Sequence, residues 1–297
     1  MSVTVRVPAK VNVQLAVGAA RPDGFHDLAN VFLAVSLHDE VTATPADRLT
    51  ITCEGPDADK VPLDRSNLAA RAAELLAARH GISPDVHLHI RKDIPVAGGM
   101  AGGSADGAGA LLACDVLWGL DTPREVLLEI CAELGSDVPF SLVGGAALGT
   151  GRGEKLTELP VGGAFHWVFA VADGGLSTPA VYGEFDRLTE GVEVPEPVAS
   201  PALLDALRTG DAVALAGALV NDLQAPALSL RPSLAETLAA GTGAGALAAL
   251  VSGSGPTTAF LVKDAEAAEA VAAALLASGT CRTARPATSP AAGATVL

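Results

Sequence analysis

A glycine-rich segment between an expected strand and an expected helix constrains this chain more than any other feature. Residues 95–104 have the sequence Pro-Val-Ala-Gly-Gly-Met-Ala-Gly-Gly-Ser. Alternating apolar residues over 86–92 predict a strand before it, and small side chains over 105–118 predict a helix after it. Glycines let backbone N–H groups converge on one anion, and the helix N-terminus adds partial positive charge. The segment therefore predicts a phosphate-binding loop.

The glycine spacing does not fit the two most familiar nucleotide-binding loops. Gly98 and Gly103 have the Walker A spacing, but Ser-Ala follows them where that loop requires Lys-Ser or Lys-Thr. The dinucleotide-binding pattern G-x-G-x-x-G is not matched either. A tight turn without a ligand is the alternative interpretation. For the glycines of 149–153 a flexible hairpin is favoured, whereas ligand approach and a plain turn are equally supported for 252–255.

Two charged residues are candidates for the chemistry that a phosphate loop alone does not perform. Phosphoryl transfer needs a group that activates the acceptor and positive charge near the transferred group. Asp137 is the best carboxylate, because it lies in a helix-end turn ahead of a proline that fixes its direction. Lys10 is the best cation, because it interrupts an apolar strand in a chain with only five lysines. An ordinary turn residue and a solvated strand face are the respective alternatives.

Charge and composition limit the partners of the chain. The net charge is −15, which argues against nucleic acid and anionic membranes as partners and leaves a small-molecule substrate. The chain shows neither an apolar run of membrane-spanning length nor an N-terminal signal peptide, so we expect a cytoplasmic protein. The four cysteines are scattered, so neither a zinc site nor a disulfide framework is expected. We expect a monomer or a weak homodimer.

Strands and helices are expected along the whole chain, with a boundary near 155–165. This boundary gives an N-terminal domain of residues 1–160 and a C-terminal domain of residues 161–297. The tail from Ala287 is expected to fray. The expected strands are 3–7, 11–15, 31–37, 40–44, 49–54, 86–92, 166–172, 246–251, 257–262 and 281–286; the expected helices are 67–80, 105–118, 122–135, 178–188 and 264–278, with short helices over 201–240.

Four segments together resemble the GHMP kinases, which are named for galactokinase, homoserine kinase, mevalonate kinase and phosphomevalonate kinase. The segments are the glycine loop, Pro-Ala-Lys-Val-Asn at 8–12, Arg-Pro-Asp-Gly-Phe-His-Asp-Leu at 21–28 and Gly-Ser-Asp-Val-Pro-Phe at 135–140. They are most similar to the members that phosphorylate a cytidine-diphosphate-linked alcohol with ATP and Mg²⁺. The resemblance implies an α+β fold of two domains, the first like ribosomal protein S5 and the second like ferredoxin.

The resemblance also implies a role for each matching residue. Asp137 matches the general base, and Lys10 matches the lysine that faces the transferring phosphoryl group. Phe25 and Tyr182 match the aromatic residues that stack on cytosine, and His26 matches the residue that hydrogen-bonds it. The other matches are Asn12 and Lys92 near substrate and nucleotide, and the ATP phosphate loop, namely Pro95, Val96, Ala97, Gly98, Gly99, Met100, Ala101, Gly102, Gly103, Ser104 and Ala105. Ser104 is our candidate Mg²⁺ ligand.

The chain departs from the family pattern at a few positions, and two rival functions stay open. Ala97, Ala101 and Ala105 stand where glycine or serine is common, and a methyl group is tolerated there where φ is negative. Phe25 replaces a common tyrosine, which keeps stacking and loses a hydroxyl. One rival is a sister kinase acting on homoserine or a mevalonate derivative. The other is a nucleotide-binding protein without catalysis.

Overall fold

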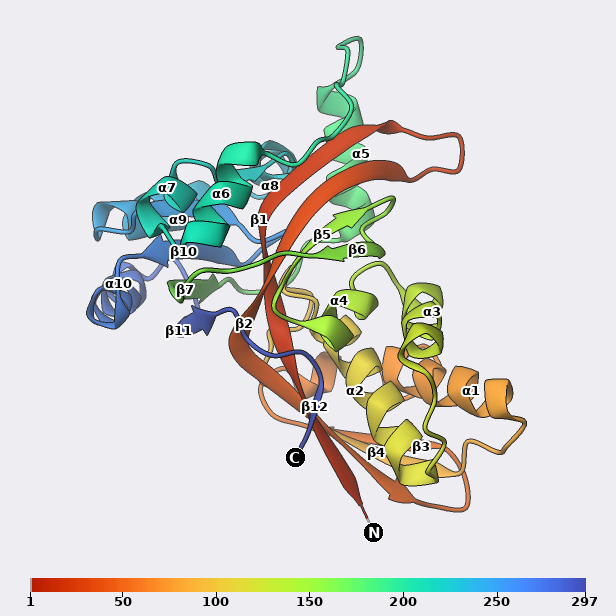
Figure 1. Cartoon of the computed structure of the whole chain (residues 1–297). Coiled ribbons are helices and arrows are strands. Elements are labelled where there is room, and N and C mark those ends of the chain that lie inside the picture. Colours follow the sequence, from red (N-terminus) through yellow and green to blue (C-terminus); the bar gives the residue numbers. More distant parts are fainter. Residues whose placement is uncertain (1) are drawn as a thin grey trace.

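Two long antiparallel strands form the axis of the molecule (Figure 1). The computed structural model describes residues 2–297. Strand β1 (Val3–Ala20) pairs with β2 (His26–Pro45), with Lys10 opposite Ala34. The two separate strands expected on either side of Pro8 are wrong, because β1 continues through the proline and a change of register beside it absorbs the irregularity. These strands bring Lys10 from the N-terminus into the centre of the molecule.

Six further strands join the β1–β2 hairpin in the first sheet. Its order is β12-β1-β2-β4-β3, while β5 also pairs with β2, β6 with β5, and β8 with β1. Strand β2 pairs with β4 along 40–45 and with β5 along 30–33, so its two halves support different parts of the protein. The six strands are β3 (Thr50–Glu54), β4 (Val86–Arg91), β5 (Ala146–Thr150), β6 (Lys155–Glu158), β8 (Val220–Asn221) and β12 (Thr295–Val296).

Helices with small side chains pack closely against this sheet. A Cβ added to Gly109 of α2 would lie 2.8 Å from a methyl group of Val7 and 2.9 Å from one of Val41, so glycine permits the close approach. The expected ends of the helix over 67–80 are confirmed by an Asn67 cap and a left-handed Gly81. The elements are η1 (Ala58–Lys60), α1 (Leu68–His80), α2 (Gly102–Trp118), α3 (Arg124–Leu134) and α4 (Val138–Val143).

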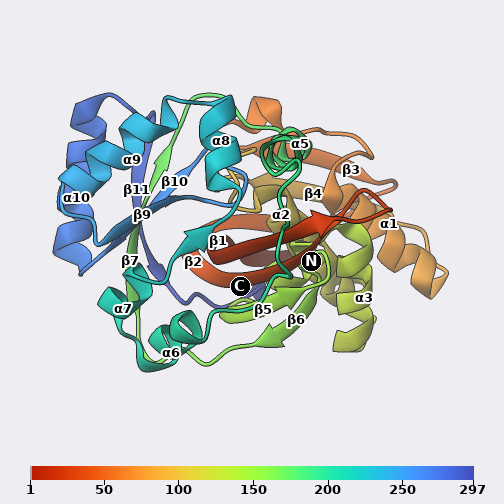
Figure 2. The same cartoon turned by 90° about the horizontal axis from the view of Figure 1, so that it is seen from above.

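The second sheet has four antiparallel strands in the order β11-β7-β10-β9. Val168 and Phe260 on one face pack with α10, whereas Trp167 and Leu261 belong to the main core with Leu207 of α6. Figure 2 shows α9 and α10 on one side of the β1–β2 hairpin and α1 and α3 on the other. The elements are β7 (Phe165–Val171), β9 (Ala248–Val251), β10 (Thr258–Val262), β11 (Thr283–Ser289), α5 (Thr178–Leu188), α6 (Pro201–Thr209), α7 (Ala212–Ala216), α8 (Gln224–Leu230), α9 (Leu234–Gly243) and α10 (Ala265–Ser278).

The C-terminal tail is ordered and crosses back to the first sheet. The expectation that it frays from Ala287 is wrong, because β11 continues to Ser289 and β12 pairs with β1. The Ala291 N–H donates to the Ala34 carbonyl at 2.9 Å, and the Ala294 N–H donates to the Ser141 carbonyl at 3.2 Å. The division at residue 160 stays a prediction. Among residues 2–297, no helix has the length and apolar character that crossing a membrane requires.

Candidate active site

The glycine-rich segment forms a tight loop that ends where α2 begins at Gly102. Gly99 has φ of +76°, and a Cβ there would lie 2.1 Å from the carbonyl oxygen of Ser252, so glycine is required. Ala97 and Ala101 also have positive φ, +53° and +61°. Left-handed backbone costs a residue with a Cβ about 1–2 kcal/mol, so the loop is strained at two alanines.

A second turn, at 252–255, lies directly against the glycine loop. The Ser252 hydroxyl donates to the Gly99 carbonyl at 3.1 Å, and the Thr257 N–H donates to the Gly98 carbonyl at 3.3 Å. The side-chain amide of Asn221 donates to the Gly253 carbonyl at 2.7 Å and braces the turn. The turn therefore packs against the glycine loop, and Gly253 and Ser254 reach the wall of the cavity described below. Ligand approach at this segment stays a prediction.

Lys10 is almost fully buried and makes three polar contacts at the centre of the site. Its ammonium donates to Asn12 Oδ1 at 2.6 Å and to the Gly99 carbonyl at 3.1 Å, and its Nζ lies 3.5 Å from Asp137 Oδ2. The amide of Asn12 in turn donates to Asn30 Oδ1 at 2.7 Å. Burial of an ammonium is costly unless it is paired and hydrogen-bonded, and these contacts meet that requirement.

Asp137 is placed by the short helix α4, of which it is the N-terminal cap residue. Phe140, one turn later, stacks on Phe32 of β2 with ring centroids 4.8 Å apart. The Lys10 ammonium lies 6.0 Å from the centroid of the same Phe32 ring. Aromatic packing between α4 and β2 therefore holds Asp137 next to Lys10, although the two residues are far apart in sequence.

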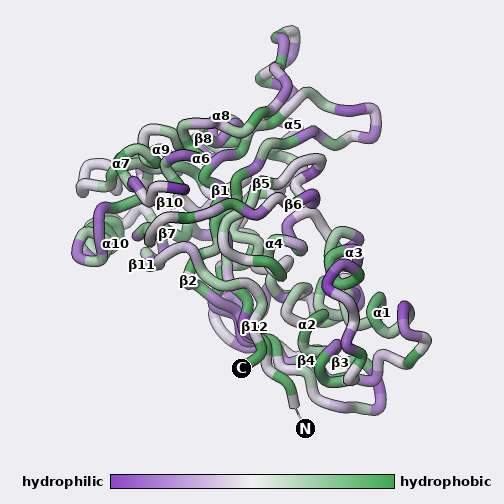
Figure 3. The backbone as a smooth tube through the Cα atoms, in the orientation of Figure 1, coloured by the Kyte–Doolittle hydropathy of each residue, from purple (hydrophilic) through white to green (hydrophobic). Residues whose placement is uncertain are grey.

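The tip of the β1–β2 hairpin and helix α5 contribute a group of aromatic and polar residues. The tip is largely hydrophilic (Figure 3), but it carries Phe25, a residue that is 47% exposed. His26 is buried, lies 5.1 Å from the Tyr182 ring centroid, and contacts Asp186 Oδ1 through Nε2 at 2.8 Å. Burial, and to a smaller extent the charge of Asp137, raise the pKa of Tyr182, so its phenol stays protonated.

A cavity of about 690 Å³ joins these groups. Its wall includes Lys10, Asp137 and most of the glycine loop, together with Phe25 and Tyr182. This volume is within the range of small-molecule sites. The cavity therefore brings together the candidates for phosphate binding, proton transfer and ring stacking. Their individual roles stay predictions.

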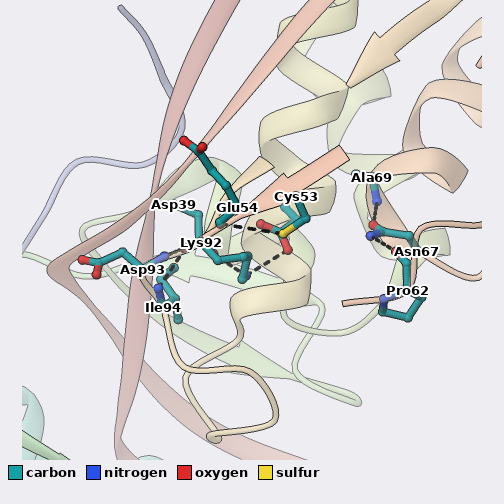
Figure 4. A network of polar contacts seen from close by, with 10 residues as sticks. Asp39, Cys53, Glu54, Pro62, Asn67, Ala69, Lys92, Asp93 and Ile94 are labelled. Atoms are coloured by element: carbon teal, nitrogen blue, oxygen red, sulfur yellow. Dashed lines mark hydrogen bonds and ion pairs between the residues drawn. The ribbon is translucent and has the colours of Figure 1, made fainter. Parts of the chain in front are cut away.

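Lys92 lies outside the wall of this cavity, in a buried polar network with Asp39 (Figure 4), and packs against the start of α2. Its ammonium contacts the carboxyl groups of Asp39 and, at 2.9 Å, Asp106, and it lies 3.1 Å from where a Gly102 Cβ would be. The other Asp39 oxygen accepts the Ile94 N–H just before the loop. The geometry thus favours support of the loop over direct substrate contact for Lys92.

The remaining expected site residues divide into those on the cavity wall and those outside it. The residues on the wall are His26, Asn12, Ala97, Gly98, Gly99, Ala101, Gly102, Gly103 and Ser104. The residues outside the wall are Pro95, Val96, Met100 and Ala105. Met100 and Ala105 are fully buried and pack in the core, so they fix the loop rather than touch a ligand.

The sequence analysis missed several residues of the cavity wall. Asn30, Asp186 and Arg152 line the cavity and were not expected there. Each lies in an ordinary strand, helix or turn, and only the long-range pairing of elements brings it to the site. Arg152 lies in the glycine-rich hairpin, which was the one available hint.

Comparison with known proteins agrees with this geometry. Residues 67–145 match the GHMP kinases N terminal domain, and residues 203–280 match the GHMP kinases C terminal domain. The chain is 82% identical to the 4-diphosphocytidyl-2-C-methyl-D-erythritol kinase of Streptomyces avermitilis over the full length of both chains. The chain belongs to the family of 4-diphosphocytidyl-2-C-methyl-D-erythritol kinases. The family member of Streptomyces coelicolor is 78% identical over the full length of both.

Solved structures of GHMP kinases share this fold. A crystal structure of 4-(cytidine 5′-diphospho)-2C-methyl-D-erythritol kinase matches with a TM-score of 0.79 and 31% identity, covering 97% of this chain and 99% of that one. A homoserine kinase from Cytophaga hutchinsonii matches with a TM-score of 0.77 at 20% identity, covering 100% and 97%, which shows the fold alone. The predicted α+β GHMP kinase fold is confirmed, and the chain is a small-molecule phosphotransferase of this family.

The buried cluster of Asp39, Lys92 and Asp106 generates a testable pH dependence. Burial raises the pKa of Asp106 to about 8 against the opposing effect of Lys92, and Asp39 adds to the rise. An unfolded aspartate has a pKa of about 3.9, so the folded protein retains a proton that the unfolded chain releases. The contribution of Asp106 to the free energy of unfolding therefore falls as pH rises from about 4 to about 8.

Asp106→Asn should remove this titration while its amide oxygen still accepts from Lys92. We expect the difference in free energy of unfolding, variant minus wild type, to increase by more than about 1 kcal/mol between pH 5 and pH 8, because only the wild type loses stability through Asp106. Urea unfolding followed by circular dichroism measures it. Asp115→Asn, near the other end of α2, is the matched control. Parallel pH curves for Asp106→Asn and wild type would contradict the assignment.

Proposed function

We propose that this chain transfers the γ-phosphoryl group of ATP to the C2 hydroxyl of 4-diphosphocytidyl-2-C-methyl-D-erythritol. This reaction belongs to the non-mevalonate route to isoprenoid precursors. The observation that carries the proposal is the shared cavity, whose wall includes the glycine loop, the Lys10–Asp137 pair and the Phe25–Tyr182 aromatics. The relatives that carry this kinase's name, at up to 82% identity, support the choice of substrate.

The aromatic part of the cavity suits a pyrimidine. A flat cytosine ring can stack on Phe25 and Tyr182, which both line the cavity. Without such a ligand, Phe25 would stay half-exposed at a hydrophilic hairpin tip. The contact between Asp186 and His26 Nε2 fixes the imidazole orientation and leaves Nδ1 for a ligand. Homoserine and mevalonate carry no nucleobase, so those substrates would leave this group of residues without a purpose.

The glycine loop suits the phosphates of ATP. A Cβ added to Gly103 would meet no atom closer than Leu68 Cδ1 at 4.0 Å, so there is open space beside the start of α2. Backbone N–H groups and the helix N-terminus would face the negative phosphates there. Leu68 also lines the cavity and offers an apolar surface to the nucleotide.

The oxygen donors on the cavity wall fit Mg²⁺ held jointly with phosphate oxygens. Among residues 2–297, no cluster of three or more His, Cys, Asp or Glu side chains could hold a metal without other ligands. Mg²⁺ usually binds one or two protein oxygens together with substrate phosphates and water. Ser104 would supply a hydroxyl, and Asp137 lies on the same wall. When bound, the cation neutralises charge on the transferring phosphates.

The Lys10–Asp137 pair would then carry out the proton and charge steps. The acceptor hydroxyl oxygen forms a bond to the γ-phosphorus, the bond from that phosphorus to the bridging oxygen breaks, and ADP leaves. Asp137 orients the hydroxyl and receives its proton late in the transfer. Lys10, held at three points, keeps a positive charge beside the transferred phosphoryl group without reorganisation.

Turnover assays with matched alcohols test the substrate. We expect ADP formation with ATP and 4-diphosphocytidyl-2-C-methyl-D-erythritol, and at least about 100-fold lower kcat/KM with homoserine, mevalonate or free methylerythritol, because these lack the stacked base. Coupled detection of ADP measures the rates. Equal rates with homoserine or mevalonate would favour a sister kinase, and ATP binding without turnover of any alcohol would favour a protein without catalysis.

Asp137→Asn tests the proton acceptor. We expect kcat to fall by about 10²–10⁴-fold, because the amide cannot take the hydroxyl proton, while the Kd for ATP stays within a factor of about three. Asp115→Asn, which lies on α2 outside the cavity wall, is the control for removal of one carboxylate. A kcat near that of wild type would remove Asp137 from the mechanism.

A further inference from the structure

The hairpin between β5 and β6 places one arginine on the wall of the active-site cavity. Arg152 lies between Gly151 and Gly153 at the turn, and its side chain is half-buried. The charged residues on the wall are Lys10, Arg152, Asp137 and Asp186. The reaction described above uses Lys10 and Asp137 and gives Arg152 no task.

Backbone contacts fix the position of this turn. The Leu28 N–H of β2 donates to the Gly151 carbonyl at 2.8 Å, and the Arg152 N–H donates to Glu154 Oε2 at 2.7 Å. Gly151 and Gly153 have φ of +68° and +105°, values that favour glycine. These contacts hold Arg152 at a defined position, so 149–153 is a fixed turn rather than the flexible hairpin that the sequence favoured.

The Arg152 guanidinium lies over the ring of Phe25. Its Cζ is 5.0 Å from the ring centroid, within the range of a cation–π contact. Across residues 2–297, the Arg152 side chain forms no ion pair, whereas nearby Arg21 is paired with Asp23 and Asp27. The guanidinium of Arg152 thus keeps its charge and its N–H donors available beside the residue expected to stack on cytosine.

A cytidine-diphosphate-linked substrate needs such a cation. Its diphosphate lies between the base and the reacting alcohol and is negatively charged, while the protein carries a net charge of −15. Lys10 is committed to Asp137, Asn12 and the glycine loop. Arginine forms paired hydrogen bonds with phosphate oxygens through its planar fork. On the cavity wall, Arg152 is the cation that remains for this group.

We propose that Arg152 binds the diphosphate of the nucleotide-linked substrate while it packs on Phe25. The residue would make the enzyme select cytidine diphosphates over uncharged cytidine compounds. This assignment rests on the proposed function, because it requires a cytidine diphosphate in the cavity. It adds a positioning and specificity residue that the glycine loop and the Lys10–Asp137 pair do not provide.

Binding of cytidine, CMP and CDP to wild type and Arg152→Gln tests the proposal by isothermal titration calorimetry. Wild type should bind CDP more tightly than cytidine. The variant should lose roughly 10- to 100-fold in affinity for CDP, as expected for charged hydrogen bonds, and less than about threefold for cytidine. The KM for the complete substrate should rise in parallel, while the KM for ATP and the melting temperature stay unchanged.

Two further variants sharpen the result. Arg152→Lys keeps the charge without the fork, so it should recover part of the CDP affinity. Arg187→Gln removes one positive charge from an exposed arginine of α5 that pairs with Glu184. It should leave the affinities for cytidine, CMP and CDP unchanged. If Arg187→Gln lost as much CDP affinity as Arg152→Gln, the loss would come from long-range electrostatics rather than from a direct contact. That result would overturn the assignment.

The outcomes separate this assignment from the function on which it rests. Equal CDP affinity in wild type and Arg152→Gln would overturn the role of Arg152 alone. Equal losses for cytidine and CDP would also overturn it, because Arg152 would then serve only to hold Phe25. Failure of wild type to bind any cytidine compound would overturn the proposed substrate and this inference with it.

Discussion

The carbonyl oxygen of Gly99 is the point on which the site depends. It accepts hydrogen bonds from Lys10 on β1 and from Ser252 in the turn after β9, so it joins three segments that are distant in sequence. The approach is so close that a methyl group at Gly99 would collide with the Ser252 carbonyl. The same contact orients the ammonium that lies 3.5 Å from the Asp137 carboxylate. Phosphate loop, cation and carboxylate are therefore positioned together rather than one by one.

Local signals in the sequence were sufficient for the ends of some elements, and the resemblance to the GHMP kinases supplied the fold class. Asn67 and Gly81 predicted both ends of α1, because capping and left-handed backbone depend on residues within one turn. The glycine loop was evident for the same reason, since its chemistry requires several glycines together ahead of a helix. The four motifs then indicated the family, which the comparisons confirm.

Long-range contacts were the part that the sequence could not supply. The motif match put Lys92 near the ligands, but pairing with Asp39 and Asp106 holds it against the start of α2, outside the cavity wall. The tail after Ala287 looked irregular, and its order comes from pairing with a sheet formed near the N-terminus. Only its glycine-rich turn hinted at Arg152, because its proposed role depends on its contact with Phe25, which is distant in sequence.

A crystal structure with the cytidine-linked alcohol and a non-hydrolysable ATP analogue tests the account most directly. The central claim is that cytosine binding and phosphoryl transfer share one cavity across the Lys10–Asp137 pair. We expect the C2 hydroxyl oxygen about 3–3.5 Å from the γ-phosphorus and within hydrogen-bond reach of Asp137, with the base between Phe25 and Tyr182. A hydroxyl out of reach of Asp137, or a base bound away from both aromatic rings, would contradict the account.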